Sequence, residues 1–236
     1  MPLTSITSNL WTIDYPVTFY GLSLTTRMTV IRLQSGDLVV ISPIQISEDL
    51  KQQIDAIGPV KTIIAPNLYH HLFAKDFVSA YPEAEFWAVE GIEKKRPDLN
   101  PDRILTETEG NLEDLYYHEF KAFRILEPRG NCDLNEYLFL HRSSQTLIIT
   151  DSAFHFDGKS SPVLQWLAKG LGIYDKLQAT LLEKWAIRDR NHAKATMQTV
   201  LSWDFDRVIM AHGSPIETNG KAQLKAGYEW LLGESL

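Results

Sequence analysis

The chain has 236 residues, a formal net charge of −7 and an isoelectric point near 5.5. Hydrophobic residues make up 44% and charged residues 22% of the sequence, which is ordinary globular usage and excludes a disordered chain. The negative net charge argues against general electrostatic binding to nucleic acid or anionic lipid. The charged run EKKRPD at 93–98 is interpreted as a solvated turn. We therefore expect a small-molecule substrate or ligand and no nucleic acid.

Cys132 is the single cysteine, so an intramolecular disulfide and a cysteine-rich metal cluster are both excluded. As a nucleophile it has no assignable partner, and a small buried residue is the commoner alternative. The N-terminus MPLTSITSNLW lacks the pattern of a signal peptide, and no apolar run approaches the ~18 residues that span a bilayer. We expect a cytoplasmic protein without a membrane span, and a homodimer is an open alternative.

In chain order, the first third predicts strands joined by tight turns. Period-two and β-branched runs mark strands at 10–14, 27–33 and 37–42, with Ser-Gly-Asp at 35–37 as the hairpin turn between the last two. Apolar residues recur at helical spacing from Ser47 until Gly58-Pro59. A helix is therefore expected there, followed by a buried strand at 60–66.

The rest of the chain predicts alternating strands and helices. A helix at 72–82, a strand at 85–90 and a proline-punctuated connection at 95–105 precede an acidic stretch, 107–114, expected to be a solvated loop. Strands are expected at 116–125, 136–142, 146–151 and 207–212, and helices at 163–186, 191–204 and 221–235. No repeat or linker interrupts the pattern, so residues 1–236 are expected to form a single α/β domain.

Residue types that bind metals follow three of the apolar strands. His70 and His71 come shortly after the strand at 60–66, Asp151 ends TLIIT, and His212 ends RVIMA. Carboxyl ends of strands meet at one edge of a layered α/β fold, where sites are usually built, and imidazole with carboxylate suits zinc, iron or manganese. Each residue alone has an ordinary explanation, because a strand-terminal Asp can cap a turn and a His beside Gly is often a loop residue.

The order of segments resembles the metallo-β-lactamase superfamily. In that superfamily a His-x-His-x-Asp-His loop, a Gly-His, an Asp and a final His-Gly carry the metal ligands. The corresponding segments here are IIAPNLYHHLF, EPRGNCDLNEY, LIITDSAF and VIMAHGSPI, and their order covers nearly the whole chain. The resemblance implies a single-domain, four-layer αββα sandwich. PNLYHHLF, NEYLFLHRSSQTLIITD and WDFDRVIMAHGSPI also look like an uncharacterised branch, a domain of unknown function, with a degenerate first motif.

The departures from the superfamily pattern fall together. Pro66 and Leu68 stand where the first two histidines of the motif belong, His70 stands at its Asp, and Asn131 falls near the Gly-His histidine. The first two histidines of the motif and the Gly-His histidine are the ligands of one of the two metal sites, so that site is expected to be lost.

The ligand positions of the other site are retained. The resemblance makes His70, His71, Asp151 and His212 the metal ligands, which predicts one divalent ion, zinc or iron. A register shifted by one residue is the alternative, and it places Asn67 and Tyr69 at motif positions, with His70 at the last one.

Two functions remain open. The first is a metal-dependent hydrolase with a mononuclear site, in which Asp151 and His71 are catalytic, Tyr69 or Asn131 orients the substrate, and the substrate is an ester, thioester, amide or phosphoester. A redox variant with iron is included. The second is a non-catalytic module that kept the fold, lost the dinuclear centre, and binds a small molecule or protein partner.

Other residues have weaker signals. Glu136, at the start of an apolar strand, is either a sheet-edge charge or a partner that orients a histidine, and His155 lies close enough to Asp151 to reach the same pocket. The charged run 188–190 is either a solvated helix start or the source of an arginine that receives an anionic substrate. The stretch 163–174 is expected to be a core face, with a dimer or lipid interface as the alternative. His118, His141 and His192 are expected to be surface or hydrogen-bonded residues.

Overall fold

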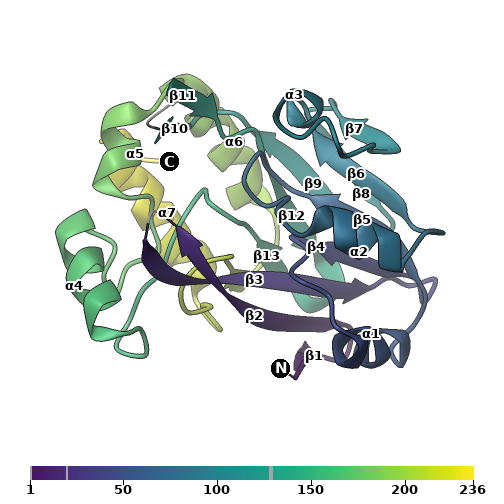
Figure 1. The fold of residues 1–236 in the computed structure, drawn as a ribbon. Coiled ribbons are helices and arrows are strands. Elements are labelled where there is room, and N and C mark those ends of the chain that lie inside the picture. Colours follow the sequence, from purple (N-terminus) through teal and green to yellow (C-terminus); the bar gives the residue numbers. More distant parts are fainter. Residues whose placement is uncertain (1, 20, 128–129) are drawn as a thin grey trace. The chain divides into compact units, whose positions relative to one another are not determined.

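The computed structural model describes residues 2–19, 21–127 and 130–236, which form two compact units (Figure 1). The first unit takes in the chain up to Glu107 together with Asn111–Leu115, and the second comprises Thr108–Gly110 and the chain from Tyr116 onward. A single domain over 1–236 stays a prediction.

The first unit contains a seven-stranded sheet in which the strands follow one another in chain order. The strands are β1 Thr4–Thr7, β2 Leu10–Phe19, β3 Leu22–Arg32, β4 Leu38–Ile41, β5 Val60–Ala65, β6 Glu85–Val89 and β7 Arg103–Leu105. β1 to β4 pair antiparallel, as the predicted hairpins require, and β4 to β7 pair parallel. The parallel strands β4 and β5 are almost entirely buried, which explains their continuous runs of Val and Ile.

Short helices connect the parallel strands of this unit. They are α1 Glu48–Asp55, α2 Ala74–Ala80 and α3 Ile92–Lys95. The Ser47 side chain caps α1 by accepting from the Leu50 N–H, and Leu50 and Ile54 are its buried residues, as the helical spacing predicts. α3 and β7 occupy parts of the region expected to be an irregular connection.

The second unit contains a five-stranded sheet in the order β14-β13-β12-β9-β8, and a separate hairpin of β10 and β11. The bounds are β8 Glu109–Leu112, β9 Leu115–Phe120, β10 Arg124–Glu127, β11 Gly130–Asp133, β12 Glu136–His141, β13 Thr146–Ile148 and β14 Arg207–Ile209. β12 and β13 form the predicted hairpin, joined by the 3-10 turn Arg142–Ser144, and β13 runs parallel to β14. Consequently the start of β12 and the ends of β13 and β14 lie at the same edge of the sheet.

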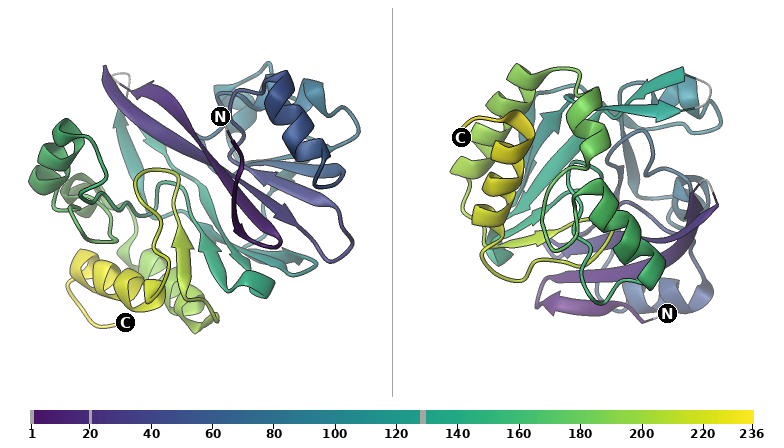
Figure 2. Two further views of the ribbon diagram at one scale, coloured as in Figure 1. Left: turned by 90° about the horizontal axis from the view of Figure 1, so that it is seen from below. Right: turned by 90° about the vertical axis from the view of Figure 1, so that its left-hand side faces the viewer.

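The helices of the second unit are α4 Pro162–Leu171, α5 Leu181–Ala186, α6 Arg190–Ser202 and α7 Gly220–Leu232. α6 buries Ala193, Thr196, Met197 and Val200, which recur every three or four residues, and it lies beside α7 in both views of Figure 2. α7 packs against β14. No helix in the described part of the chain combines the length and the apolar character needed to cross a bilayer.

Three expectations about elements are wrong. The acidic stretch 107–114 contains β8 rather than being only a loop, and the strand expected at 116–125 ends at Phe120 before a new strand begins at Arg124. The helix expected at 163–186 is two helices, because Gly172 takes a left-handed conformation (φ +80°) and ends α4.

Candidate metal centre

Asp151 and His212 meet at the edge of the second unit's sheet. They follow β13 and β14, which are neighbouring parallel strands, and Asp151 Oδ1 lies 3.3 Å from His212 Nε2. Both side chains are largely buried. Two ligand atoms ~2.0–2.2 Å from one tetrahedral ion lie about 3.3–3.6 Å apart. The pair therefore has the separation that a shared ion requires.

Glu136 fixes the backbone that carries Asp151. Its side chain is fully buried at the start of β12, and its carboxylate accepts hydrogen bonds from the N–H groups of Thr150 and Asp151 and from the Ser152 hydroxyl, each at 2.8 Å. The sheet-edge alternative for Glu136 is wrong, because β12 lies between β13 and β9. The residue positions the Asp151 turn.

The carboxylates of Glu136 and Asp151 repel each other, which disfavours the charged form of Glu136. Burial raises the pKa of Glu136, and the neighbouring charge of Asp151 raises it further, whereas the three hydrogen bonds act in the opposite direction. Burial first, and Glu136 second, raise the pKa of Tyr228, whose hydroxyl donates to the Ser152 carbonyl at 2.8 Å. A bound cation beside Asp151 would offset this like-charge repulsion, so the donor chemistry suits a divalent metal ion.

His212 is held on its other side by an aromatic ring and a tight backbone contact. The His212 ring stacks on Phe154, with ring centroids 6.1 Å apart. The next residue, Gly213, has φ +89°, and a Cβ there would lie 2.0 Å from the His155 carbonyl oxygen. Only glycine fits this position, so the His-Gly pair follows from packing as well as from any ligand role.

His155 lies in the same segment but is directed to other partners. Its Nδ1 lies 2.9 Å from the Ser214 carbonyl oxygen, and its Nε2 lies 3.9 Å from an Asp175 oxygen. Since a carbonyl only accepts, Nδ1 carries a proton. A pocket role for His155 stays a prediction.

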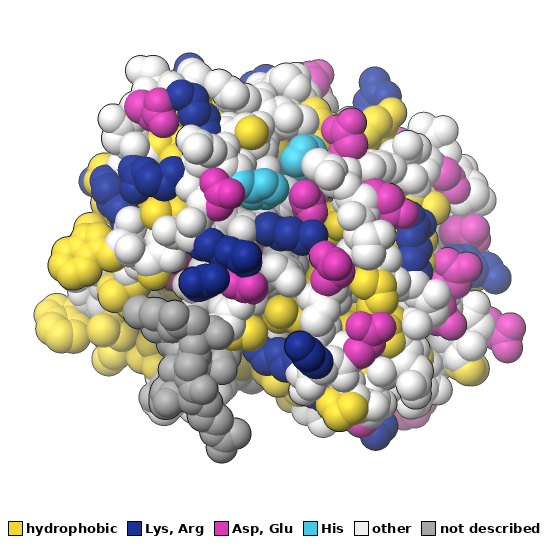
Figure 3. Space-filling view, turned by 90° about the horizontal axis from the view of Figure 1, so that it is seen from above, with side chains coloured by type: hydrophobic (Ala, Val, Ile, Leu, Met, Phe, Trp, Pro, Cys, Tyr) yellow, Lys and Arg dark blue, Asp and Glu magenta, His cyan; other side chains and the backbone are white. Residues whose placement is uncertain are grey.

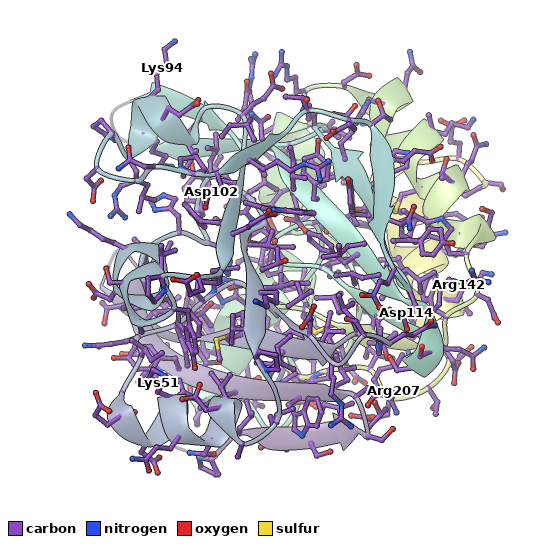
Figure 4. The ribbon with its side chains drawn as sticks, turned by 90° about the vertical axis from the view of Figure 1, so that its right-hand side faces the viewer. Lys51, Lys94, Asp102, Asp114, Arg142 and Arg207 are labelled. Atoms are coloured by element: carbon purple, nitrogen blue, oxygen red, sulfur yellow. The ribbon has the colours of Figure 1, made fainter. Side chains whose placement is uncertain are left out.

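The opposite end of the second unit's sheet carries two arginines with protein partners. Figure 4 shows Arg142 and Arg207 at the same end of this unit. Arg207 forms an ion pair with Glu217 at 2.9 Å, and Arg142 donates to the Tyr116 hydroxyl at 3.1 Å.

In the first unit, His70 is positioned by polar neighbours from adjacent strands. Its Nδ1 lies 2.7 Å from the Ser42 hydroxyl, which follows β4, and 3.5 Å from the Thr26 hydroxyl on β3. The side-chain oxygen of Asn67 accepts from the N–H groups of Tyr69 and His70, both at 2.8 Å, and so forms the turn that aims His70. An imidazole held at Nδ1 in this way presents Nε2 for coordination.

Ser42 has an unusual backbone. Its φ is +58°, in the left-handed region that costs a non-glycine residue roughly 1–2 kcal/mol. Its N–H still donates to the Ile64 carbonyl, so the strand exit keeps its pairing. A serine at a position that favours glycine supplies the hydroxyl that His70 contacts.

His71 has a different environment from His70. The Arg96 guanidinium lies 3.1 Å from His71 Nδ1, and Lys95 lies over the Tyr69 ring at 3.6 Å. Burial, then Arg96 and Lys95, lower the pKa of His71 to about 4, so the ring is neutral at pH 7. Since a guanidinium only donates, Nδ1 accepts and the ring proton sits on Nε2.

Sequence reasoning missed several of these neighbours. The charge pattern predicts a solvated turn at Arg96, but the structure places this half-buried side chain against His71 and pairs it with Asp98. Ser42 follows a buried strand, as His70 and Asp151 do, so the same signal could have found it. Phe154 and Tyr228 carry no sequence signal, because only the fold brings them to His212 and Ser152.

The remaining candidates lie elsewhere or are directed elsewhere. Asn131 is in β11, and its side chain lies outside the described part of the structure. Arg188 pairs with Asp133 at 2.7 Å, and Arg190 donates to carbonyl groups at the end of α7. His118, His141 and His192 each hydrogen-bond to a neighbouring protein group, as expected.

Comparison with known proteins identifies the scaffold. A family model described as "Domain of unknown function (DUF4336)" matches residues 7–185. Among proteins with curated functions, none matches the sequence. Similar solved structures include a metallo-beta-lactamase from Pontibacter korlensis, with 14% identity, a TM-score of 0.64 and 98% of each chain covered.

Two further structures give the same result. The metallo-beta-lactamase from Hirschia baltica is 9% identical with a TM-score of 0.65, covering 98% of this chain and 97% of that one. FIM-1 from Pseudomonas aeruginosa, in its mono-zinc form, is 10% identical with a TM-score of 0.63, covering 98% and 94%. The expected α/β class and the likeness to the metallo-β-lactamase fold are confirmed, and that fold is a scaffold of the metal-dependent hydrolase type.

Proposed function

The chain belongs to the DUF4336 family, and we propose that it is a metal-dependent hydrolase with one divalent ion, zinc or iron, bound by Asp151 and His212 and, as the resemblance of the sequence motif implies, by His70. The observation that carries the proposal is the 3.3 Å separation of Asp151 Oδ1 and His212 Nε2 at the ends of neighbouring parallel strands. Two imidazoles and a carboxylate are a common donor set for a catalytic metal that keeps an open position.

His70 suits the third position better than His71 does. The Ser42 hydroxyl can accept the Nδ1 proton of His70 and leave Nε2 as the donor, which is the usual arrangement around metal-bound histidines. His71 has Nδ1 occupied by Arg96 and the proton on Nε2. Coordination or catalysis by His71 stays a prediction. Before its Nε2 could bind a metal ion, the ring proton would have to leave that atom.

One ion fits the sequence better than two. Pro66 and Leu68 stand at positions where the superfamily motif has histidines, and both are buried, with Leu68 packed over Gly91. Asn67, between them, is engaged in the turn that aims His70. This segment therefore serves packing and positioning.

The chemistry would be hydrolysis of an ester, thioester, amide or phosphoester. A bound divalent ion lowers the pKa of a coordinated water and polarises the electrophile. The protein's part would be to hold Asp151 rigidly through Glu136, so that one carboxylate oxygen could bind the ion and the other could orient a water molecule and accept its proton.

The test is the metal content of the purified full chain, measured by plasma mass spectrometry after expression with zinc and iron. We expect about one ion per chain, and loss of more than about 90% of it in Asp151→Asn and His212→Gln. His192→Gln is the matched control, because His192 is also in the second unit but contacts the Lys121 N–H and not Asp151. Metal-loaded protein is then assayed on ester, thioester and phosphodiester substrates.

A non-catalytic module is the second candidate, and the setting of His71 against Arg96 favours it. A binding module would show no metal-dependent turnover of any of these substrates, even with one ion bound. Absence of metal after metal-replete expression would refute the hydrolase proposal outright.

A further inference from the structure

Large hydrophobic side chains are exposed on α4 and α5. We call Val163, Trp166, Leu181, Leu182 and Trp185 the α4–α5 patch. Trp166 is 72% exposed and Trp185 is 85% exposed, whereas most tryptophans are largely buried. Figure 3 shows hydrophobic side chains protruding at the side where Figure 1 places these two helices. Such a concentration is more than the scattered exposure of a soluble surface.

The unit's own core does not account for the patch. On α4, Leu164, Ala168 and Leu171 face a small core with Phe156 and Ile173. Val163 and Trp166 lie on the other side of the helix and are exposed. The expectation of a core face for 163–174 is thus correct for only half of the helix, and the other half is apolar without being buried.

The two helices are held in a fixed relation. The Gln178 side chain donates to the Gly172 carbonyl at 2.7 Å, and a Cβ at Gly172 would lie 3.6 Å from Leu181 Cγ, so the end of α4 lies beside the start of α5. Thr180 and Glu183 form a capping box that starts α5. The patch is therefore preformed and needs little ordering on binding.

The charge around the patch differs from that of the whole chain. Residues 157–190 contain six Lys and Arg against four Asp and Glu, a net of +2 in a chain of net charge −7. Lys159, Lys169 and Lys176 are exposed, as is Asp175. Of the other acidic groups, Glu183 is largely buried in its capping box, Asp157 is half-buried, and Asp189 is exposed at the start of α6.

We propose that the α4–α5 patch binds the surface of an anionic lipid bilayer. Tryptophan, leucine and valine suit the boundary between headgroups and acyl chains, and the surrounding lysines suit the phosphates above it. A second copy of the chain is the less suitable occupant, because a two-fold interface would set Lys169 and Lys176 close to their own symmetry mates. The net charge of the whole chain argues against anionic lipid, whereas the local charge around the patch has the opposite sign and favours it. The proposal does not depend on the metal site.

The test is flotation of the full chain with vesicles of phosphatidylcholine alone and of phosphatidylcholine with 30% phosphatidylserine. We expect binding to the anionic vesicles and at least a tenfold weaker affinity in Trp166→Ser/Trp185→Ser. Lys169→Glu/Lys176→Glu should weaken binding about 30-fold or more, and added salt should weaken it in the unmodified chain. Leu72→Ser is the matched control, because Leu72 is 61% exposed but lies in the first unit.

Thermal unfolding of each variant, followed by circular dichroism, checks that these surface substitutions leave the fold intact. Absence of binding to anionic vesicles overturns the proposal, as does binding that the tryptophan and lysine variants leave unchanged. Analytical ultracentrifugation that finds a dimer broken by Trp166→Ser/Trp185→Ser, without vesicle binding, would instead assign the patch to a second copy.

Discussion

Ser42 offers a way to separate the needs of the fold from those of the site. Ser42→Gly relieves a left-handed backbone worth about 1–2 kcal/mol and removes a hydroxyl bonded to His70 worth about 1 kcal/mol. The two effects are similar in size and opposite in sign. We therefore expect the free energy of unfolding of the metal-free protein to change by less than about 1 kcal/mol.

Ser42→Ala removes the same hydroxyl but keeps the left-handed strain. Its free energy of unfolding should fall below that of Ser42→Gly by about 1–2 kcal/mol, which urea denaturation followed by circular dichroism can resolve. Both variants should bind zinc about 10–100-fold more weakly in a competition titration, because each frees the His70 ring. Thr26→Val is the control, because its hydroxyl lies 3.5 Å from Nδ1, and a change below about threefold is expected.

Equal destabilisation by the glycine and alanine variants would refute the reasoning about backbone strain. Unchanged zinc affinity in both would refute the role of Ser42 in positioning His70, whatever the stability.

Three further predictions concern the buried groups. Glu136→Gln should lower the free energy of unfolding by about 1–3 kcal/mol in urea denaturation, because an amide NH₂ would face a backbone N–H that now donates to the carboxylate, and an unchanged midpoint would contradict this. The pKa of His71 is about 4 in the folded protein and 6.5 in the unfolded protein, so the unfolded state binds a proton first as the pH falls. The free energy of unfolding of the metal-free protein should therefore decrease by up to about 3 kcal/mol between pH 6.5 and pH 4. The His71→Gln variant should not show this decrease. Gly213→Ala should cost more than about 2 kcal/mol, since its Cβ would meet the His155 carbonyl oxygen; a thermal midpoint within about 2 °C of the unmodified chain would disagree.

The strand exits were predictable from sequence because they depend on local pattern. A buried apolar run followed at once by His or Asp marked Asp151 and His212, and the pairing of β13 with β14 brings these two together. The order of segments was enough to predict the fold class.

The surroundings of these residues were less predictable because they depend on distant packing. Arg96 looked like part of a charged turn, since nothing in EKKRPD indicates contact with a histidine 25 residues earlier. The break between α4 and α5 was missed because apolar spacing continues through Gly172, whose left-handed conformation ends the first helix. Trp166 followed the core pattern in spacing and yet lies exposed.

The hydrogen bond from the Tyr228 hydroxyl to the Ser152 carbonyl limits where the chain can be truncated for expression. Tyr228 lies on α7, beyond residue 185, where the match to the family model ends. A fragment that stopped there would lack His212, would leave β13 as an unprotected sheet edge, and would free the turn after Asp151 from its support. We expect such a fragment to aggregate, so the boundaries for expressing members of this family should run to the end of α7.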